Sequence, residues 1–387
     1  MSNRSLLASV FALSLSIGYA EAKSFVVLHA FQGSDGANPY STLIRDGAGN
    51  LYGTTDGGGA NGLGTVFQLA PDGTETVLHA FGGASDGILP VAGLITDKAG
   101  NFYGTTQDAT DAYGAVFKLA PDGTETVLHY FPGGTDGAMP VAPLAIDKAG
   151  NLYGTTQSGG GDGCHGTGCG IAFEITPDGT ETVLYSFTGK KGDGATPVAG
   201  LIAKEKYLYG TTLYGGADLY GTVFRLAEDG SEKVLHSFAG GPGDGANPEA
   251  GVTMDAAGNL YGTSYDGGAY QFGAVFRLAS DGTISLIHSF AGGTDGAYPM
   301  AGLLLDASGN LYGTTNNGGS NACQGSGCGT VFKIAPDGTE TVLHAFGHKS
   351  EGRNPEASLI GDRRGNLYGT TPYGGTDNFG TIFKVKE

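Results

Sequence analysis

Residues 64–81 read GTVFQLAPDGTETVLHAF, and this phrase recurs along the chain with few changes. Its second half returns as TVLHYF at 126–131, KVLHSF at 233–238 and TVLHAF at 341–346. Two places carry only half of the phrase. Residues 24–31, SFVVLHAF, have the tail without the front, and residues 380–387, GTIFKVKE, have the front without the tail. The two ends of the chain therefore hold complementary halves of one repeat unit.

The number of repeats follows from a second motif, the pentad LYGTT or a close variant of it. It occurs seven times in steps of 50 to 56 residues. Its tyrosines are Tyr52, Tyr103, Tyr153, Tyr209, Tyr261, Tyr312 and Tyr368. The pattern runs through the whole chain after its first two dozen residues, so we expect one domain with no linker.

Each period contains four short runs rich in Val, Phe, Tyr, Leu and Thr, separated by Asp-Gly and Gly-Asn turn signals. In the second period these runs are 90–97, 101–106, 114–120 and 125–131. Four antiparallel strands in each of seven periods predict an all-β fold, a seven-bladed β-propeller. A β-helix rung is too short for four such strands, and an open solenoid needs capping repeats. Because each end of the chain carries one half of the repeat unit, we predict that residues 24–30 form the outer strand of the last blade, beside 380–386.

The first residues are typical of a targeting segment. Arg4 precedes an apolar run from Leu6 to Ala20, which ends in the small-x-small sequence Ala20-Glu21-Ala22. We predict a signal peptide over residues 1–22 and a single propeller domain over 23–387. The alternative is a membrane anchor, but the run is short for a span. The expected protein is secreted, extracellular or periplasmic, with no membrane span in the mature chain.

Composition narrows the classes of partner. The formal net charge of −18 argues against nucleic acid and anionic membrane, because both require a basic surface. The 73 glycines do not fall at every third residue, which excludes collagen, and they cluster with Asp, Asn and Thr as turn residues do. We expect a soluble monomer.

The repeated sequence resembles the GloVer (Gloeo/Verruco) tandem-repeat family. The resemblance rests on segments like GTVFKLAPDGTETVLHAF, on NLYGTT and on paired glycines, which recur along the periods. The resemblance implies a secreted or surface-displayed bacterial propeller. It brings no activity and no binding residues. The period is also close to that of kelch repeats, but these usually carry a tryptophan and this chain has none.

The four cysteines form two matched C-x₄-C pairs, Cys164 with Cys169 and Cys323 with Cys328. Both pairs lie between the second and third strands of a period that is 56 residues long. In an exported protein such pairs predict two local disulfides. A single four-cysteine zinc site is the alternative, but it would join blades 3 and 6, which lie across the ring from one another.

Histidine and aspartate recur with the repeat. A catalytic or metal-binding histidine should be singular or clustered, whereas these recur once per outer strand, with Tyr185 in the same slot of blade 3. We predict a repeated packing or cross-strand hydrogen-bonding role for His29, His79, His129, His236, His288 and His344. The aspartates of PDGT and DxxGN fit turns, and neither motif matches a calcium loop.

The joints of a propeller fall on two faces, and here the two faces differ. One face carries the nearly uniform DKAGN and APDGT turns, and the other carries loops that vary in length and composition. Variable loops on a rigid scaffold are where recognition usually resides. Aromatic rings there suit sugars or extended peptides, unless they pack between blades: Tyr113, Tyr214, Tyr220, Tyr265, Tyr270, Phe272, Tyr373 and Phe379.

The innermost strand of each blade begins just after a recurrent proline, so the residues around it are expected at the mouth of the central channel. Blades 2 to 4 give mainly apolar residues there. Blades 5, 7 and 1 give Asn-Pro-Glu, Asn-Pro-Glu and Asn-Pro-Tyr. The predicted ligand-binding residues are Asn38, Tyr40, Asn247, Glu249, Arg353, Asn354 and Glu356. The simpler alternative is that these residues differ between blades by sequence drift, because a solvated channel mouth constrains them little.

Two function classes follow from these patterns. One is a non-enzymatic scaffold that binds an extracellular glycan, peptide or protein on the variable face; no nucleophile–base pair or phosphate loop stands out against it. The other is a metal-assisted lactonase- or lyase-like hydrolase, in which Glu249 and Glu356 would hold Ca²⁺ or Mg²⁺, ions that favour oxygen ligands. The sequence favours the scaffold, which requires no cofactor and no catalytic residue.

Overall fold

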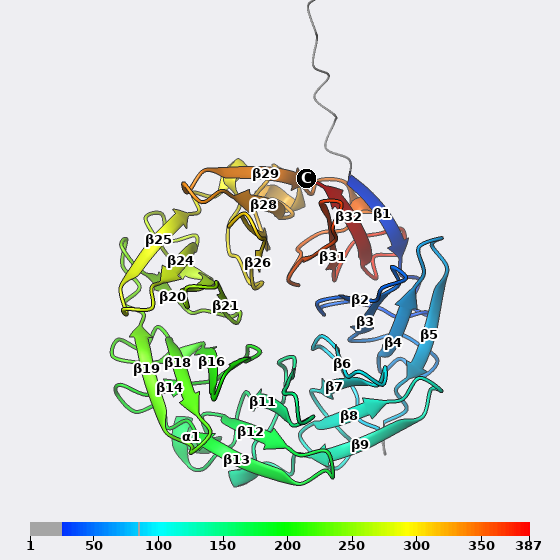
Figure 1. The fold of residues 1–387 in the computed structure, drawn as a ribbon. Helices are drawn as coiled ribbons and strands as arrows, with labels where there is room; N and C mark the ends of the chain where they lie inside the picture. The colour runs from blue at the N-terminus through cyan, green and yellow to red at the C-terminus, as the bar shows by residue number, and fades with distance from the viewer. Residues whose placement is uncertain (1–24, 84–85) are drawn as a thin grey trace, which may run out of the picture.

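The computed structural model describes residues 25–83 and 86–387. Seven four-stranded antiparallel sheets stand around a central channel, which confirms the seven-bladed propeller (Figure 1). The signal peptide predicted over residues 1–22 lies outside the described residues. Within the described part of the chain, no helix is long and apolar enough to cross a membrane.

In every blade the four strands follow one another from the channel to the rim. Blades 1 to 3 consist of β2 (Ile44–Arg45), β3 (Leu51–Thr55), β4 (Thr65–Leu69) and β5 (Glu75–Ala80); β6 (Ile95–Thr96), β7 (Phe102–Thr106), β8 (Ala115–Leu119) and β9 (Glu125–Tyr130); and β10 (Ala145–Ile146), β11 (Leu152–Thr156), β12 (Ile171–Ile175) and β13 (Glu181–Ser186). Blades 4 to 6 consist of β15 (Ile202–Lys204), β16 (Tyr207–Thr212), β18 (Thr222–Ala227) and β19 (Glu232–Ser237); β21 (Thr253–Met254), β22 (Leu260–Ser264), β24 (Ala274–Leu278) and β25 (Ile284–Ser289); and β26 (Leu304–Leu305), β27 (Leu311–Thr315), β28 (Thr330–Ile334) and β29 (Glu340–Ala345).

Blade 7 contains strands from both ends of the chain. Its strands are β30 (Ile360–Gly361), β31 (Asn366–Thr371), β32 (Thr381–Lys386) and β1 (Phe25–Ala30). The first strand pairs antiparallel with the last, from Phe25 opposite Val385 to Ala30 opposite Thr381. Figure 1 shows the blue β1 lying along the red β32 at the rim. The predicted closure of the ring by the N-terminal strand is confirmed.

The loops add short elements. Two-stranded ribbons join β14 (Gly194–Ala195) to β17 (Tyr214–Gly215) and β20 (Gly245–Ala246) to β23 (Asp266–Gly267). The helical segments, each of three or four residues, are η1 (Gly134–Asp136), α1 (Gly163–Gly166), η2 (Gly293–Asp295), η3 (Cys323–Gly325) and η4 (Lys349–Glu351).

Each cysteine pair forms a local disulfide, Cys164–Cys169 and Cys323–Cys328, as predicted. The first cysteine of each pair lies in one of the short helical segments, α1 or η3. With all four sulfur atoms bonded in pairs, the alternative zinc site is wrong.

The first four residues of the pentad LYGTT each have a role, as blade 1 illustrates. Leu51 is buried, and the Tyr52 hydroxyl donates to Asp46 Oδ2 at 3.1 Å. A side chain at Gly53 would begin 2.8 Å from the Phe67 ring, so only glycine fits there. Thr54 donates across the seam to the Ala92 carbonyl of the next blade at 2.9 Å. Its counterpart makes this bond at all seven seams, closing a ring of identical links.

That link also corrects the predicted innermost strand. The sequence predicted a strand over 90–97, but β6 is only Ile95–Thr96. The residues before it bend along the channel wall, where the Ala92 carbonyl accepts from Thr54 of the preceding blade instead of from a ladder partner. The innermost strand is short in every blade, with two ladder positions in six blades and three in blade 4.

Phenylalanines pack the blades against one another. The ring that follows each outer strand meets a ring from the third strand of the next blade. Phe31 and Phe67 are fully buried and lie 5.2 Å apart at the seam between blades 7 and 1. Comparable pairs, with ring centroids 5.0 to 5.3 Å apart, occur at the other six seams. Edge-to-face geometry adds stability beyond the area buried.

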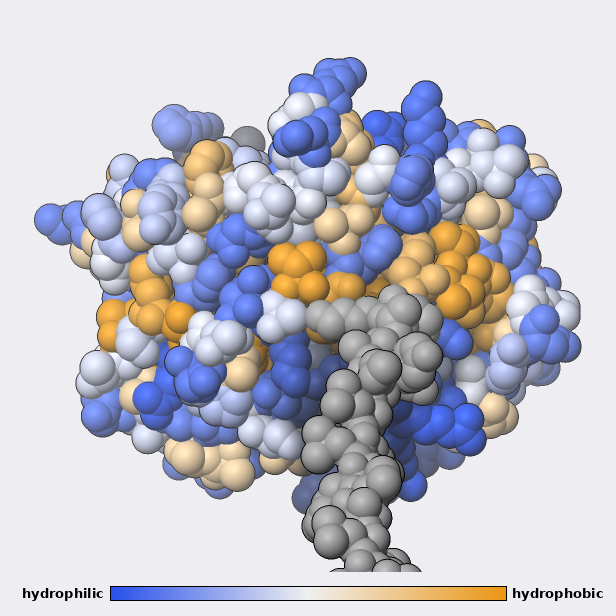
Figure 2. Space-filling view, turned by 90° about the horizontal axis from the view of Figure 1, so that it is seen from above, coloured by the Kyte–Doolittle hydropathy of each residue, from blue (hydrophilic) through white to orange (hydrophobic). Residues whose placement is uncertain are grey.

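The antiparallel order of the strands places their connections on two opposite faces of the propeller. Turns within the pairs β2–β3 and β4–β5, and their counterparts, form one face, here called the turn face. The joints β3–β4 and the blade-to-blade connections form the other, the loop face. Figure 2 looks onto the rim over β29 and β1, where hydrophilic side chains prevail and hydrophobic ones form separate patches along the middle band.

Candidate functional site

The residue after the recurrent proline lines the channel in every blade. These seven residues surround one cavity of about 140 Å³: Tyr40, Val91, Val141, Val198, Glu249, Met300 and Glu356. Valines line the side formed by blades 2 to 4. The polar residues gather on the opposite side because blades 5, 7 and 1 are near neighbours in the ring.

The two glutamates of the channel are both partly buried, and the charge of Glu356 acts on Glu249. Burial raises the pKa of Glu249 to about 7, with further contributions from the charges of Glu356 and Asp266. Burial likewise raises the pKa of Glu356 to about 7, although the Asn316 amide, 2.9 Å from its Oε1, acts in the opposite direction. Both side chains therefore keep a proton to a higher pH than an ordinary glutamate, and a cation between them would favour the charged form.

Tyr40 and Arg353 are joined through a loop of blade 7. The hydroxyls of Tyr40 and Tyr373 lie 2.6 Å apart, and burial followed by this hydrogen bond raises the pKa of Tyr40. The Arg353 guanidinium lies 5.6 Å from the centre of the Tyr373 ring and donates to Asn378 Oδ1 at 3.0 Å. Arg353 thus interacts with this loop, and Tyr40 is the residue that connects the loop to the channel.

The three predicted asparagines do not line the channel cavity. Each has a left-handed backbone, with φ near 55°, as do the residues at the same position in all other blades. Their amides hold the loop of the preceding blade, by donating to the carbonyls of Pro372, Leu213 and Asn316 at 2.9 to 3.1 Å. Asparagine tolerates this conformation better than most residues. The donors are Asn38, Asn247 and Asn354.

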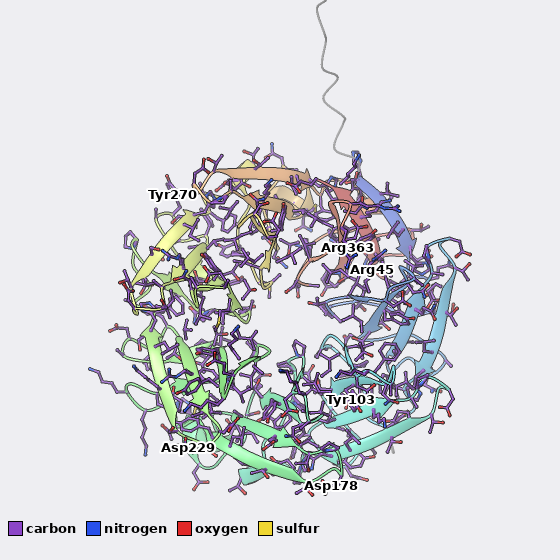
Figure 3. All side chains as sticks on the ribbon, viewed as in Figure 1. Arg45, Tyr103, Asp178, Asp229, Tyr270 and Arg363 are labelled. Atoms are coloured by element: carbon purple, nitrogen blue, oxygen red, sulfur yellow. A yellow bond between two sulfur atoms is a disulfide. The ribbon has the colours of Figure 1, made fainter. Side chains whose placement is uncertain are left out.

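The predicted aromatic residues of the loop face separate into two groups. Tyr265 stacks on Tyr298 with centroids 4.9 Å apart, Phe272 packs edge-on against the same ring, and Tyr373 bonds to Tyr40. The other five are 37 to 58% exposed: Tyr113, Tyr214, Tyr220, Tyr270 and Phe379. Figure 3 shows Tyr270 at the outer part of the ring.

Several exposed aromatic rings pack against glycine residues. A side chain at Gly240 would begin 3.0 Å from the Tyr220 ring, and one at Gly133 would begin 3.0 Å from the Tyr113 ring. The absent side chain lets one face of the ring rest on backbone while much of the ring stays open to solvent. Such rings keep little conformational freedom to lose when a ligand stacks on them.

The histidines belong to junctions between blades that the sequence did not reveal. In five of them the imidazole Nε2 lies 2.9 to 3.2 Å from an aspartate of the following loop, and the Tyr185 hydroxyl makes the same contact with Asp193. The partner lies in a loop, and the expected cross-strand hydrogen bond is therefore replaced by a strand-to-loop bond. The spacing of six to eight residues recurs with the period and could have indicated the pair.

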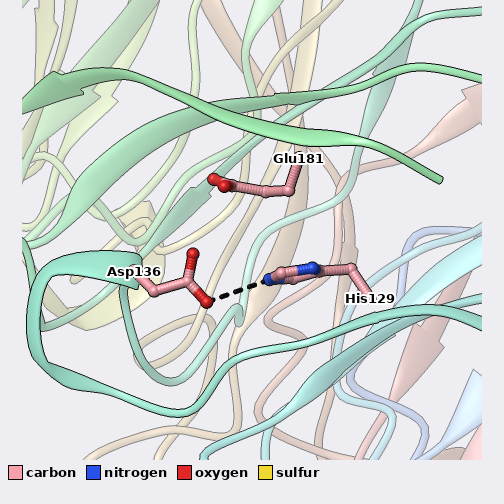
Figure 4. Close-up of side chains that lie close together, drawn as sticks. All are labelled: His129, Asp136 and Glu181. Atoms are coloured by element: carbon pink, nitrogen blue, oxygen red, sulfur yellow. Dashed lines mark hydrogen bonds and ion pairs between the residues drawn. The ribbon is translucent and has the colours of Figure 1, made fainter.

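A glutamate from the next blade faces several of these pairs. At one junction, donor atoms of His129, Asp136 and Glu181 lie within 4.8 Å of one another (Figure 4). Burial, followed by the charge of Asp136, raises the pKa of Glu181 to about 7. The same holds for Glu75, Glu125 and Glu232, each beside an aspartate of the preceding loop. Because the arrangement repeats around the rim, its primary role is to join blades.

Three solved structures similar to this chain are remote from it in sequence. A protein named "putative gluconolactonase" is 13% identical with a TM-score of 0.45, covering 95% of this chain and 93% of that one. The extracellular domains of a "putative hybrid two component system" and a "putative one component system" from B. thetaiotaomicron are 13% and 14% identical, with TM-scores of 0.55 and 0.54. This chain is covered to 93% by each, but spans only 39% and 40% of those chains. These likenesses concern the fold.

Comparison with curated proteins gives no match. Comparison with protein-family models does give a match. Residues 15–169, 110–326 and 212–387 each match the Gloeobacter/Verrucomicrobia repeat, and together these ranges run through all seven blades. The chain belongs to the Gloeobacter/Verrucomicrobia repeat family.

Proposed function

We propose that this protein is an exported binding scaffold that recognises a glycan, peptide or protein on its loop face. The observation that carries the proposal is a group of exposed apolar side chains on blades 4 and 5, here called the blade 4–5 platform: Tyr214, Leu219, Tyr220 and Tyr270, which are 44 to 61% exposed. Export is supported by the two disulfides and by the apolar leader at the N-terminus.

One hydrogen bond links the two parts of the platform across the seam between blades 4 and 5. Gly215 forms a bridge with Tyr220, which places Tyr214 and Tyr220 on one loop. Tyr220 stands on Gly240, and the Gln271 amide, next to Tyr270, donates to the Gly240 carbonyl at 3.5 Å. Aromatic rings held at fixed positions among glycines suit the flat faces of sugars or the extended backbone of a peptide.

The test is a glycan and peptide array on the mature protein, followed by titration of the best ligand. Replacement of Tyr214, Tyr220 and Tyr270 by alanine is expected to weaken binding at least tenfold, since each ring contributes about 0.5–1.5 kcal/mol. Tyr130→Ala, at an exposed ring on the rim, is the matched control and should leave the affinity unchanged. Equal affinity of the triple variant and the wild type would contradict the proposal.

A metal-assisted hydrolase at the channel mouth is the second candidate. It is favoured by one observation, the two carboxyl groups of Glu249 and Glu356 whose pKa values burial raises to about 7. Ca²⁺ or Mg²⁺ there would act as a Lewis acid on a lactone or uronate substrate. The fit is limited, because the three asparagine amides hold loops and only two carboxylates remain in the channel.

Thermal melting with millimolar calcium, with magnesium and with chelator tests this candidate. An ion that binds only the folded state raises the melting temperature with ln(1 + [L]/Kd). Glu249→Gln with Glu356→Gln is then expected to abolish the effect, whereas Glu205→Gln with Glu228→Gln, two exposed positions with the same change of charge, should retain it. Coincident wild-type curves in the three buffers would exclude the metal.

A further inference from the structure

The seam between blades 7 and 1 contains a large cavity on the turn face, about 1040 Å³ in volume. Its walls come from the β2–β3 and β4–β5 turns of blade 1, the β30–β31 turn of blade 7, and strands β1 and β32. It lies on the opposite face from the blade 4–5 platform. A cavity of this size is at the upper end of the range for small-molecule sites.

Four cations line the cavity in a chain whose net charge is −18: Arg45, Arg363, Arg364 and Lys384. Figure 3 shows Arg45 and Arg363 at neighbouring positions on blades 1 and 7. Arg45, Arg363 and Arg364 are exposed, and Lys384 is half-buried. Exposed charges act mainly within about 8 Å at physiological ionic strength. A ligand in the cavity therefore senses these cations more than the distant acidic surface.

The repeat shows that this chemistry is particular to one seam. The position of Arg45 holds Thr96, Ile146, Ala203, Met254, Leu305 or Gly361 in the other blades. The residue pair Arg363-Arg364 replaces Lys-Ala, Ala-Ala or Ala-Ser in the same turn of other blades. Two small residues, Gly47 and Gly361, also line the cavity. All the other blades carry a larger residue at the position of Gly361: Arg45, Thr96, Ile146, Ala203, Met254 and Leu305.

The three aspartates in the cavity wall keep their negative charges, so the four cations exceed them by one charge, but each carboxylate is held within its own turn. Asp46 accepts hydrogen bonds from the Gly49 and Asn50 backbone, the Asn50 amide and the Tyr52 hydroxyl. Asp362 accepts hydrogen bonds from the Arg364 and Asn366 backbone, the Asn366 amide and the Tyr368 hydroxyl, and these bonds outweigh burial and lower its pKa to about 2. Asp72 caps its own turn at Thr74. In contrast, the ion pairs found among residues 25–83 and 86–387 include none of the four cations.

We propose that this seam cavity binds a small polyanion, a ligand carrying two or more carboxylate, sulfate or phosphate groups. Three guanidinium groups can each hold such a group through two parallel N–H···O bonds, and the Lys384 ammonium adds a point charge. The Tyr368 ring is part of the same wall, and Arg45 reaches near enough across the seam to influence its hydroxyl. The cavity has room for a ligand of oligosaccharide size.

Calorimetric titration of the full chain tests this, with trigalacturonate for carboxylate, a sulfated trisaccharide for sulfate and tripolyphosphate for phosphate. Neutral maltotriose is the uncharged control. At least one polyanion is expected to bind, with affinity that falls as salt is raised, and the arm that binds most tightly identifies the anionic group. Failure of all three polyanions, or equal binding of maltotriose, overturns the proposal.

Paired variants locate the site. Arg45→Gln with Arg364→Gln is expected to weaken binding at least tenfold. Lys98→Gln with Lys148→Gln makes the same change of charge in exposed turns of the turn face on blades 2 and 3, and should change the affinity less than twofold. Equal losses in both pairs would mean that diffuse charge and not this cavity binds the anion. Melting curves check that both pairs fold like the wild type.

Discussion

A chain that begins at Gln32 is expected to be destabilised by more than about 5 kcal/mol relative to one that begins at Phe25, and to lose cooperative unfolding at 37 °C. The missing strand pairs with β32 over five positions and supplies Phe31, which is fully buried against Phe67. Loss of one buried phenylalanine alone costs about 3–5 kcal/mol. The truncation also removes the stack of Phe25 on His344 and exposes the edge of β32.

Urea and thermal denaturation of the two chains measure this effect. A peptide of residues 25–33 added in trans is expected to restore much of the lost stability, because it can add to the open edge as a strand. A shuffled peptide of the same composition is the control and should restore none. Melting of the shorter chain within about 2 °C of the longer one would show that closure contributes little to stability.

The second large effect is a decrease in stability as pH rises from 5 to 8. Six glutamates have a pKa raised to about 7 in the folded chain from 4.5: Glu75, Glu125, Glu181, Glu232, Glu249 and Glu356. Burial is the main cause at each. Between these two values the folded chain binds more protons than the unfolded chain, so the free energy of unfolding falls with rising pH.

The turn aspartates act in the opposite direction at lower pH. Hydrogen bonds outweigh burial and lower the pKa of Asp46, Asp97, Asp255, Asp306 and Asp362, so their contribution is present above pH 3.8 and is lost below it. Stability should therefore be greatest near pH 5. Because the rim glutamates are about half exposed, solvent screening reduces their effect, and we expect a fall in melting temperature of roughly 3–6 °C between pH 5 and 8.

Melting curves from pH 4.5 to 8.5 measure this dependence. Replacing Glu75, Glu125, Glu181 and Glu232 by glutamine should flatten most of it, since the amide cannot ionise. The exposed Glu205→Gln is the control and should leave the slope unchanged. A melting temperature that rises from pH 5 to pH 8 would contradict the assignment of these groups.

The architecture could be predicted because each of its determinants repeats. LYGTT recurs because its first threonine bonds across all seven seams and its tyrosine bonds to a turn aspartate in six of the seven blades. The half-repeats at the two ends of the chain indicated the partner of β1. The cysteine pairs were predictable for a different reason. Each is local, and each coincides with an insertion of its own.

The candidate site was harder to predict from the sequence than the fold, and the asparagines show why. Asn38, Asn247 and Asn354 precede the channel residues, and in sequence they look like ligands beside Glu249 and Glu356. The structure shows instead that their amides donate to carbonyls of the preceding blade, a contact between blades that cannot be seen within one repeat. The cations of the seam escaped notice for a related reason. Arg45 and Arg363 lie far apart in the chain, and only the closed ring brings them to one cavity.

The pairing of β1 with β32 also sets the order of events when the chain is made. Phe25 is synthesised near the start and its partner Val385 near the end, so at 5–20 residues per second the first strand waits about 20–70 s. Blades 1 to 6 use strands that are contiguous in the chain and can form as they emerge. Blade 7 is completed only by the most non-local contact of the molecule, a slow kind of step. Until then the nascent ring remains open at a single seam, and that same seam later contains the cavity lined by Arg45 and Arg363.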